Sequence, residues 1–247
     1  MTGRDAPHAA APPRPAPPAR RARATPFFKA VSAIAWKDLR AELRSREMIS
    51  AMLLFAVLAV VTFSLSLALN RQARQEAIAG VLWVTLAFAG TLGFNRSLAQ
   101  EKDRGSLDAL LLAPVDRSTL FFGKMIGNIV FMLIVGVVLV PLLTVLFGVS
   151  LFVPVLWVVM ALGIVGFAAV GTLLASITVH ARGREMLLPV ILLPVALPLI
   201  MAAVNGSQGI IAGEMLERWA MWPFVLLAYD IAFMAAAYML FDFVVEE

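Results

Sequence analysis

The sequence predicts an all-α integral membrane protein with six transmembrane helices, preceded by a cytoplasmic amphipathic interfacial helix. Two observations lead to this fold class. The chain is 61% hydrophobic and 15% charged, whereas soluble domains are close to half apolar and a quarter charged. Its apolar residues also form uncharged runs of about the 20 residues that a helix needs to cross the hydrocarbon layer.

The uncharged runs set the number of spans. The first run has 22 residues and the second 18, whereas a run of 57 residues over 125–181 is too long for one crossing. It divides near 148–154 into two helices joined by a tight turn. The fifth span should close at the breaker run Asn205–Gly209. The expected spans are about 48–69, 77–94, 125–147, 156–179, 186–204 and 222–243.

Two segments come before the first span. Residues 1–26 are rich in Ala, Pro and Arg with little to bury, which predicts a disordered tail. Residues 27–247 then form the six-helix membrane domain. Its first segment, 27–47, has apolar residues such as Val31 and Ile34 at spacings of three and four among many charges, which is typical of a helix in the headgroup plane. The alternative is a solvated helix with a modest apolar stripe, but Trp36 favours the interface.

The basic residues predict the orientation. With the N terminus inside, the tail and first helix hold ten of the 20 Lys and Arg residues, the loop after the second span five, and the loop after the fourth span two. Three, Arg71, Arg74 and Arg218, fall outside. This positive-inside bias predicts that both termini are cytoplasmic. It also accounts for the basic charge balance, so the sequence predicts no nucleic acid partner.

The residue types exclude several kinds of chemistry. The sequence has no cysteine and two histidines, His8 and His180. Disulfides, Cys-based metal sites and thiol chemistry are therefore excluded, and two histidines cannot form a metal cluster by themselves. No pair of acids, His–acid pair or nucleophile–base set lies at one membrane depth, which argues against an intramembrane enzyme.

The longest charged stretch in the body of the chain is EKDRGSLDALLLAPVDRST, residues 101–119, in the predicted cytoplasmic loop after the second span. Leu107, Leu110 and their neighbours predict a short amphipathic helix that begins near Gly105 and ends near Pro114. Exposed leucines usually mark a contact surface, so we interpret this segment as a docking helix for another protein. The alternative is a solvated loop that only links two helices.

A phosphate-binding loop is excluded. The pair Gly123-Lys124 has the spacing of the end of such a loop, but the leading glycine is missing and Met125 stands where Ser or Thr would bind magnesium. The segment also leads into a membrane span instead of following a strand. The sequence therefore predicts no nucleotide site in this chain.

Asp230 is an intramembrane polar candidate, because it is the only carboxylate well inside a predicted span. Buried membrane acids are functional suspects by default, which suggests a proton or ion relay. The alternative is a protonated or hydrogen-bonded acid that faces another helix, beside Tyr229 or a threonine. The absence of a matching intramembrane Lys, Arg or His favours the alternative.

The fourth span contains small residues, including Gly163, Gly166 and Gly171, which permit close helix approach. Packing within one subunit and a dimer seam are both open. After the fifth span, residues 210–219 are expected to form a short amphipathic helix at the outer surface.

The fifth span carries Pro189, Pro194 and Pro198. Because proline removes a backbone donor, this span is expected to be kinked or broken. Kinked spans often line a moving pathway, and a static bend is the alternative.

Two stretches resemble a known family. GVLWVTLAFAGTLGFNRSLAQEKDRGSLDALLLAPVDRSTLFFGK (80–124) and LLPVILLPVALPLI (187–200) are similar to the haem exporter protein B family of bacterial cytochrome c maturation. Six spans with an amphipathic helix before the first also resemble the permeases of ABC-2 type exporters. The resemblance covers about residues 27–247 and implies an ABC-2 type permease in the bacterial cytoplasmic (inner) membrane.

The resemblance implies a membrane subunit that is not itself an enzyme. Two copies would pair with two copies of a separate ATP-binding subunit, beside haem-handling membrane proteins and a periplasmic haem chaperone. In that family ATP hydrolysis is linked to release of the haem-loaded chaperone. The segment 101–116 would seat on the ATPase. The docking residues this implies are Glu101, Arg104, Gly105, Leu107, Leu110, Pro114 and Asp116.

We expect no cofactor bound directly by this chain. Haem iron usually takes His, Met, Cys or Tyr as an axial ligand, and no His or Cys lies outside or in the outer halves of the predicted spans. Methionine in an apolar helix is more often packing. Two rival functions stay open: an ABC-2 permease for a lipid, polysaccharide or drug, and a membrane scaffold for haem-handling proteins through which nothing crosses.

Overall fold

The computed structural model describes residues 26–68, 70–103, 117–178, 181 and 183–244. These residues are almost all helical and include no strand, which confirms the predicted all-α class. The helices are α1 Phe27–Ser45, α2 Glu47–Ser66, α3 Arg71–Asp103, α5 Arg117–Phe147, α6 Pro154–Thr178, α7 Arg184–Ile211, α8 Leu216–Trp219 and α9 Met221–Val244.

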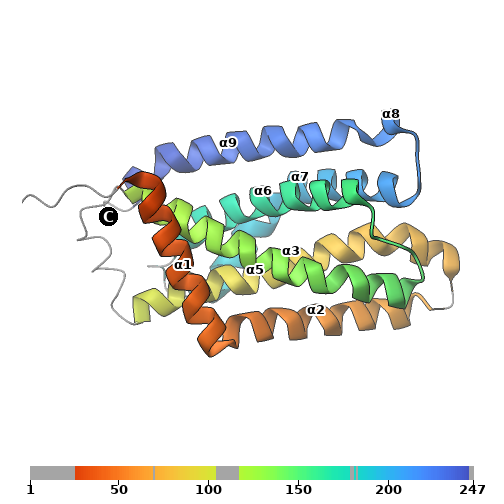
Figure 1. The fold of residues 1–247 in the computed structure, drawn as a ribbon, viewed down its shortest axis with the longest axis horizontal. Helices are drawn as coiled ribbons and strands as arrows, with labels where there is room; N and C mark the ends of the chain where they lie inside the picture. The colour runs from red at the N-terminus through yellow and green to blue at the C-terminus, as the bar shows by residue number, and fades with distance from the viewer. Residues whose placement is uncertain (1–25, 69, 104–116, 179–180, 182, 245–247) are drawn as a thin grey trace, which may run out of the picture.

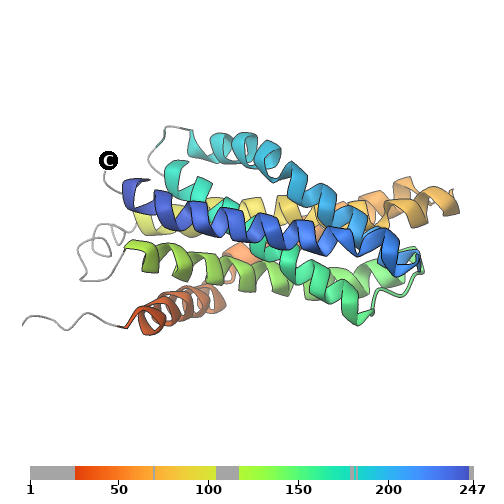
Figure 2. The same ribbon diagram turned by 90° about the horizontal axis from the view of Figure 1, so that it is seen from above.

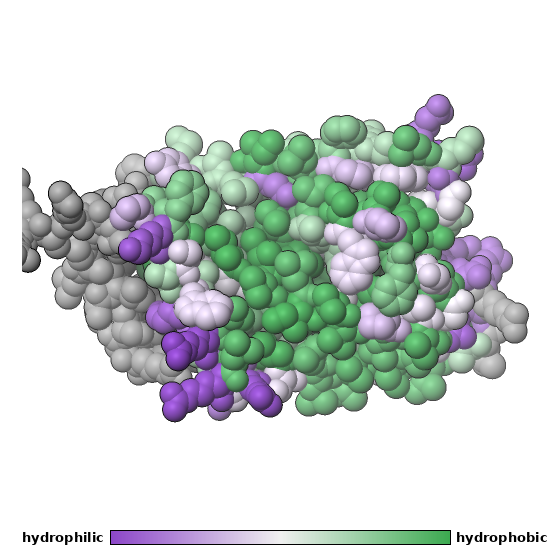
Figure 3. All heavy atoms as spheres, viewed as in Figure 1, coloured by the Kyte–Doolittle hydropathy of each residue, from purple (hydrophilic) through white to green (hydrophobic). Residues whose placement is uncertain are grey.

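Six of the described helices, α2, α3, α5, α6, α7 and α9, are long and apolar enough to cross a membrane. Successive spans run in opposite directions, so Phe27 and Val244 lie at the same end of the bundle (Figure 1). Figure 3 shows a hydrophobic band around the middle of one face, with hydrophilic residues towards both ends. A bundle that crosses a hydrocarbon layer presents such a band to lipid.

The centre of the bundle is formed by α3 and α6. In the most apolar stretch of each span, 72% of residues are buried in α3 and α6, against 17% in α9. Glycines of α6 allow this packing, because an added Cβ at Gly163 would lie 2.2 Å from the Trp83 ring and one at Gly171 would lie 2.1 Å from the Phe94 ring. These two glycines of the fourth span therefore serve packing within one chain.

The prediction that the fifth span closes at Asn205–Gly209 is wrong. Helix α7 continues through this run to Ile211. Neighbouring helices hold the run in place: the Trp83 indole N–H of α3 donates to Ser207 Oγ at 2.9 Å. Helix propensity is a weak preference that such packing overrides, and in lipid a continuous helix keeps its backbone groups hydrogen-bonded.

Pro189, Pro194 and Pro198 all lie inside α7. The ribbon of α7 changes direction along its length (Figure 2), as expected where prolines remove backbone donors. Pro189 cannot donate to the carbonyl of Glu185, and Asn95 Nδ2 of α3 donates to that oxygen instead, at 3.3 Å. The span is therefore bent but not broken.

Residues 210–219 are not one helix, contrary to the prediction. After α7 ends, Gly213 adopts φ +67°, and α8 is a single turn over Leu216–Trp219. A glycine in the left-handed conformation is a common helix terminator, and here it separates the two helices.

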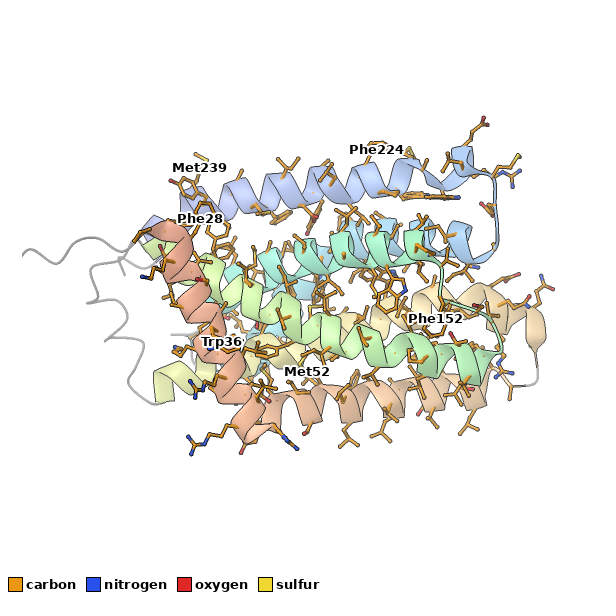
Figure 4. All side chains as sticks on the ribbon, in the orientation of Figure 1. Phe28, Trp36, Met52, Phe152, Phe224 and Met239 are labelled. Carbon is orange, nitrogen blue, oxygen red and sulfur yellow. The ribbon has the colours of Figure 1, made fainter. Side chains whose placement is uncertain are left out.

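Helix α1 lies across one end of the bundle, steeply inclined to the spans (Figure 1). Val31 and Ile34 of its predicted apolar stripe are buried, and they face α5 at Gly123. This stripe therefore contacts protein. Phe28 and Trp36 lie on the exposed side of α1 (Figure 4), where aromatic rings suit the lipid headgroup region.

Candidate coupling site

The end of the bundle that carries α1, called here the α1 end, also carries both ends of the predicted docking segment. Helix α3 ends at Asp103 and α5 begins at Arg117, both at the α1 end (Figure 1). Both helices extend beyond the predicted spans 77–94 and 125–147, so rigid helices flank residues 104–116. Glu101 lies in the last turn of α3. The remaining docking candidates, Arg104, Gly105, Leu107, Leu110, Pro114 and Asp116, lie outside the described residues.

Helix α1 packs into a glycine groove on α5. Gly123 and Gly127 are one helical turn apart, so they share a face of α5. An added Cβ at Gly123 would lie 2.7 Å from Ile34 Cβ, and one at Gly127 would lie 3.8 Å from Asp38 Cβ. The missing side chain at Gly123 therefore lets the two helices approach closely, as small residues do between membrane helices.

A buried ion pair lies beside this groove. Lys124 Nζ of α5 is 2.7 Å from Asp38 Oδ2 of α1, and the side chains are 3% and 12% exposed. Lys37 Nζ lies 3.4 Å from the other oxygen, Asp38 Oδ1. A charge removed from water is tolerated when it is paired. The pair therefore fixes where α1 sits along α5.

The turn between α1 and α2 is held by Glu42. Arg46 at this turn has φ 57°, in the left-handed region that few non-glycine residues adopt. The buried Glu42 accepts the Ile49 N–H on Oε1 at 2.8 Å. That N–H belongs to the first turn of α2 and has no partner within its own helix, and the helix N terminus favours a carboxylate. Glu42 thereby sets the angle between the two helices.

A further link joins α2 to α3 at the same end. Arg96 near the end of α3 forms an ion pair with Glu47, the first residue of α2. The pair is partly exposed, so its own contribution to stability is small. With the α1–α5 and α1–α2 contacts, it connects α1, α2, α3 and α5 into one network at the α1 end.

Asp230 lies away from this network, in the middle of α9. Its carboxylate is buried and faces α6, where an added Cβ at Gly166 would lie 2.3 Å from Asp230 Oδ1. Among the described residues no donor bonds to Oδ1. The neighbouring Tyr229 hydroxyl donates to the Val195 carbonyl of α7 at 2.9 Å. The acid therefore faces another helix, and a relay through it stays a prediction.

The part of the chain that the structure describes was also compared with the usual donor sets of metal sites. No group of three or more His, Cys, Asp or Glu residues is arranged there to hold an ion. The chemistry that these side chains support is helix pairing by charge and shape.

The comparison with known proteins decides the family. The model of the CcmB protein family matches residues 29–245, which include all of α1 except its first two residues, the whole of the network described above and Asp230. This chain belongs to the CcmB protein family. The resemblance to the haem exporter protein B family is confirmed.

Two relatives have the name Heme exporter protein B. The protein of Pseudomonas aeruginosa is 23% identical over 180 residues, which cover 72% of this chain and 80% of that protein. The protein of Rhodobacter capsulatus is 28% identical over 183 residues, which cover 70% of this chain and 82% of that protein. The similarity therefore extends over most of this chain and of both relatives.

Three polar residues of this network were missed by sequence reasoning: Asp38, Glu42 and Lys124. Gly123-Lys124 served only to exclude a phosphate loop. The spacing Gly123-x-x-x-Gly127 was the available signal, because it is typical of a close helix contact. Asp38 and Glu42 gave no signal, since both lie in a segment crowded with charges.

Proposed function

We propose that this CcmB-family chain is the permease subunit of an ABC transporter complex required for cytochrome c biogenesis. The main support is the family match over residues 29–245, together with the six helices that can cross a membrane. In this proposal the complex exports or handles haem and uses ATP to release a haem-loaded periplasmic chaperone. Haem is held by the partners, and this chain binds no cofactor directly.

The proposed mechanism is mechanical. A separate ATP-binding subunit seats on residues 101–116 and moves them, and α3 and α5 tilt because they are continuous with that segment. Two copies of this chain pair with two ATPase copies in the bacterial inner membrane. The excess of basic residues in the tail, α1 and the loops of the α1 end supports a cytoplasmic position for that end and both termini.

Deletion of the gene tests the function. We expect loss of covalent c-type haem in membranes and accumulation of the haem–chaperone adduct, read by haem staining of gels. Normal cytochromes would instead indicate an ABC-2 permease for a lipid, polysaccharide or drug, and would contradict the proposal.

Docking is tested by the double substitution L107D/L110D. Two carboxylates in place of the leucines should abolish co-purification of the ATPase, since an apolar contact surface cannot accept unpaired charges. The matched control is M215D/L216D at the opposite end of the bundle, where both side chains are exposed. Unchanged assembly with full cytochrome c production in L107D/L110D would contradict docking and favour the scaffold.

A further inference from the structure

We propose that Asp38 and Lys124 form a lock that keeps α1 fixed to α5 throughout the transport cycle, so that α1 carries movement of α5 to α2. The proposal rests on the proposed function for its driving force, a partner ATPase acting at residues 101–116. Asp38 and Lys124 are positioning residues here, because they act through the helices that carry them.

The first step is that α5 receives any displacement of the docking segment directly. Arg117 is the first residue of α5 and Lys124 lies two turns further on. A helix is stiff over this distance, since each residue is hydrogen-bonded to the next turn. Movement at residue 117 therefore reaches Lys124 with little loss.

The second step is that α1 is tied to α5 at this level by charge as well as by packing. Apolar contact at Gly123 and Ile34 holds the helices together but allows sliding along the groove. The Lys124–Asp38 pair, at 2.7 Å and with Lys124 buried, has one position of good geometry. Because the Lys124 side chain is only 3% exposed, a one-turn slip would separate the two charges at a large energetic penalty.

The third step is the connection from α1 to α2. Glu42 lies one turn beyond Asp38 and binds the first turn of α2 through the Ile49 N–H. The turn at Arg46 is therefore clamped and does not act as a free hinge. Helix α2 also packs directly against α5, and α1 adds a rigid arm between these two spans.

A disulfide can replace the lock, because the sequence has no cysteine of its own. The Cβ of a residue at 127 would lie 3.8 Å from the Cβ of residue 38, close to the usual Cβ separation in disulfides of about 3.8 Å. The variant D38C/G127C in the full complex therefore lacks the ion pair when reduced and has a covalent link when oxidised. Thiol labelling in membranes measures how much of the link has formed.

The expected result is that the link forms readily in membranes and that its oxidation state controls coupling. Reduced D38C/G127C should lose ATP-dependent chaperone release by about fivefold or more, the lower end of typical coupling between sites. Oxidation should restore release to near the unmodified level. The single variant G127C keeps the ion pair and should be active in both states, whereas D38C should be impaired in both.

Two results would overturn the lock. If the link does not form, α1 does not pack on α5 as described. If the oxidised protein is inactive and reduction restores release, α1 must leave α5 during the cycle.

The charge-swapped variant D38K/K124D covers the case in which D38C/G127C does not fold. The swap should recover chaperone release and protein level relative to D38K and K124D alone, a rescue that loss of packing volume would not give. If chaperone release by D38K/K124D is as low as in the single variants, the Asp38–Lys124 ion pair does not act as a lock. The two proposals can fail separately. If the complex without substitutions shows no ATP-dependent chaperone release, the proposed function is contradicted. Thiol labelling needs no ATPase, so it still tests whether α1 is held against α5.

Discussion

Two carboxylates of this chain, the partly buried Asp38 and the buried Asp230, each face a glycine of a neighbouring helix, but their surroundings differ. Asp38 lies against Gly127 with Lys124 Nζ at 2.7 Å. Asp230 lies against Gly166, and no donor among the described residues bonds to its Oδ1. The α1–α5 contact therefore combines an ion pair with the close approach at Gly123, whereas the α6–α9 contact at Asp230 depends on the space that a missing Cβ leaves.

The largest effect should follow from Asp38→Leu. It removes the Asp38 carboxylate from the buried Lys124 ammonium, and breaking a buried pair by removing one partner costs about 3–5 kcal/mol. The measurement is the apparent midpoint of thermal unfolding of the purified chain in detergent. Lys124→Met should be milder, because Asp38 is more exposed than Lys124 and lies near Lys37. An unchanged midpoint in both variants would show that the contact does not depend on charge.

Alanine substitutions at Gly166 and Gly127 test how strongly each helix contact depends on the space beside its carboxylate. Gly166→Ala forces Asp230 or Leu199 to move, since the new Cβ would lie 2.3 Å from Asp230 Oδ1 and 2.6 Å from Leu199 Cδ1. Such overpacking destabilises by about 1–3 kcal/mol. Gly127→Ala is the matched control, because its Cβ meets Asp38 at an ordinary 3.8 Å. Equal midpoints for the two variants would contradict the shape-dependent α6–α9 contact.

A third carboxylate, Glu42, differs from Asp38 and Asp230 because its partner is a backbone N–H group. Glu42→Ala removes the acceptor for the Ile49 N–H and should destabilise by about 1 kcal/mol, as loss of a helix cap does. Glu42→Gln keeps a side-chain oxygen and should lose less. The unfolding midpoints of the two variants report this difference. A Gln variant as unstable as the Ala variant would mean that the charge of Glu42 matters more than its hydrogen bond.

Much of the fold follows from sequence pattern because a bilayer imposes one rule on every span. Long uncharged runs must be helices, since lipid cannot satisfy backbone polar groups, and this gave the number of spans. The same rule explains why the prediction that the fifth span ends at Asn205–Gly209 was wrong. Residues that stop helices in water stay helical here, where Trp83 and Trp222 pack against the run.

The network at the α1 end depends on tertiary contacts, which a single sequence does not display. Nothing in the segment 27–47 distinguishes Asp38 from its charged neighbours, because its partner lies 86 positions away, at Lys124. Only the packing of α1 on α5 brings the two together. Asp230 was recognisable because a lone acid inside an apolar run stands out, but that it faces Gly166 required the structure.

The smallest effect on stability is expected for Asp230→Asn. An amide fits the same space and no cation among the described residues loses a partner, so the unfolding midpoint should change by an amount equivalent to about 1 kcal/mol or less. Asp38→Asn is the matched variant and should lower the midpoint more, because it weakens a buried pair. A large loss for Asp230→Asn would reveal a cation that pairs with Asp230 and would remove the distinction between the two carboxylates. Asp230→Asn that folds normally but fails to support chaperone release would instead favour the relay, since only a titrating group loses its function when the shape is kept.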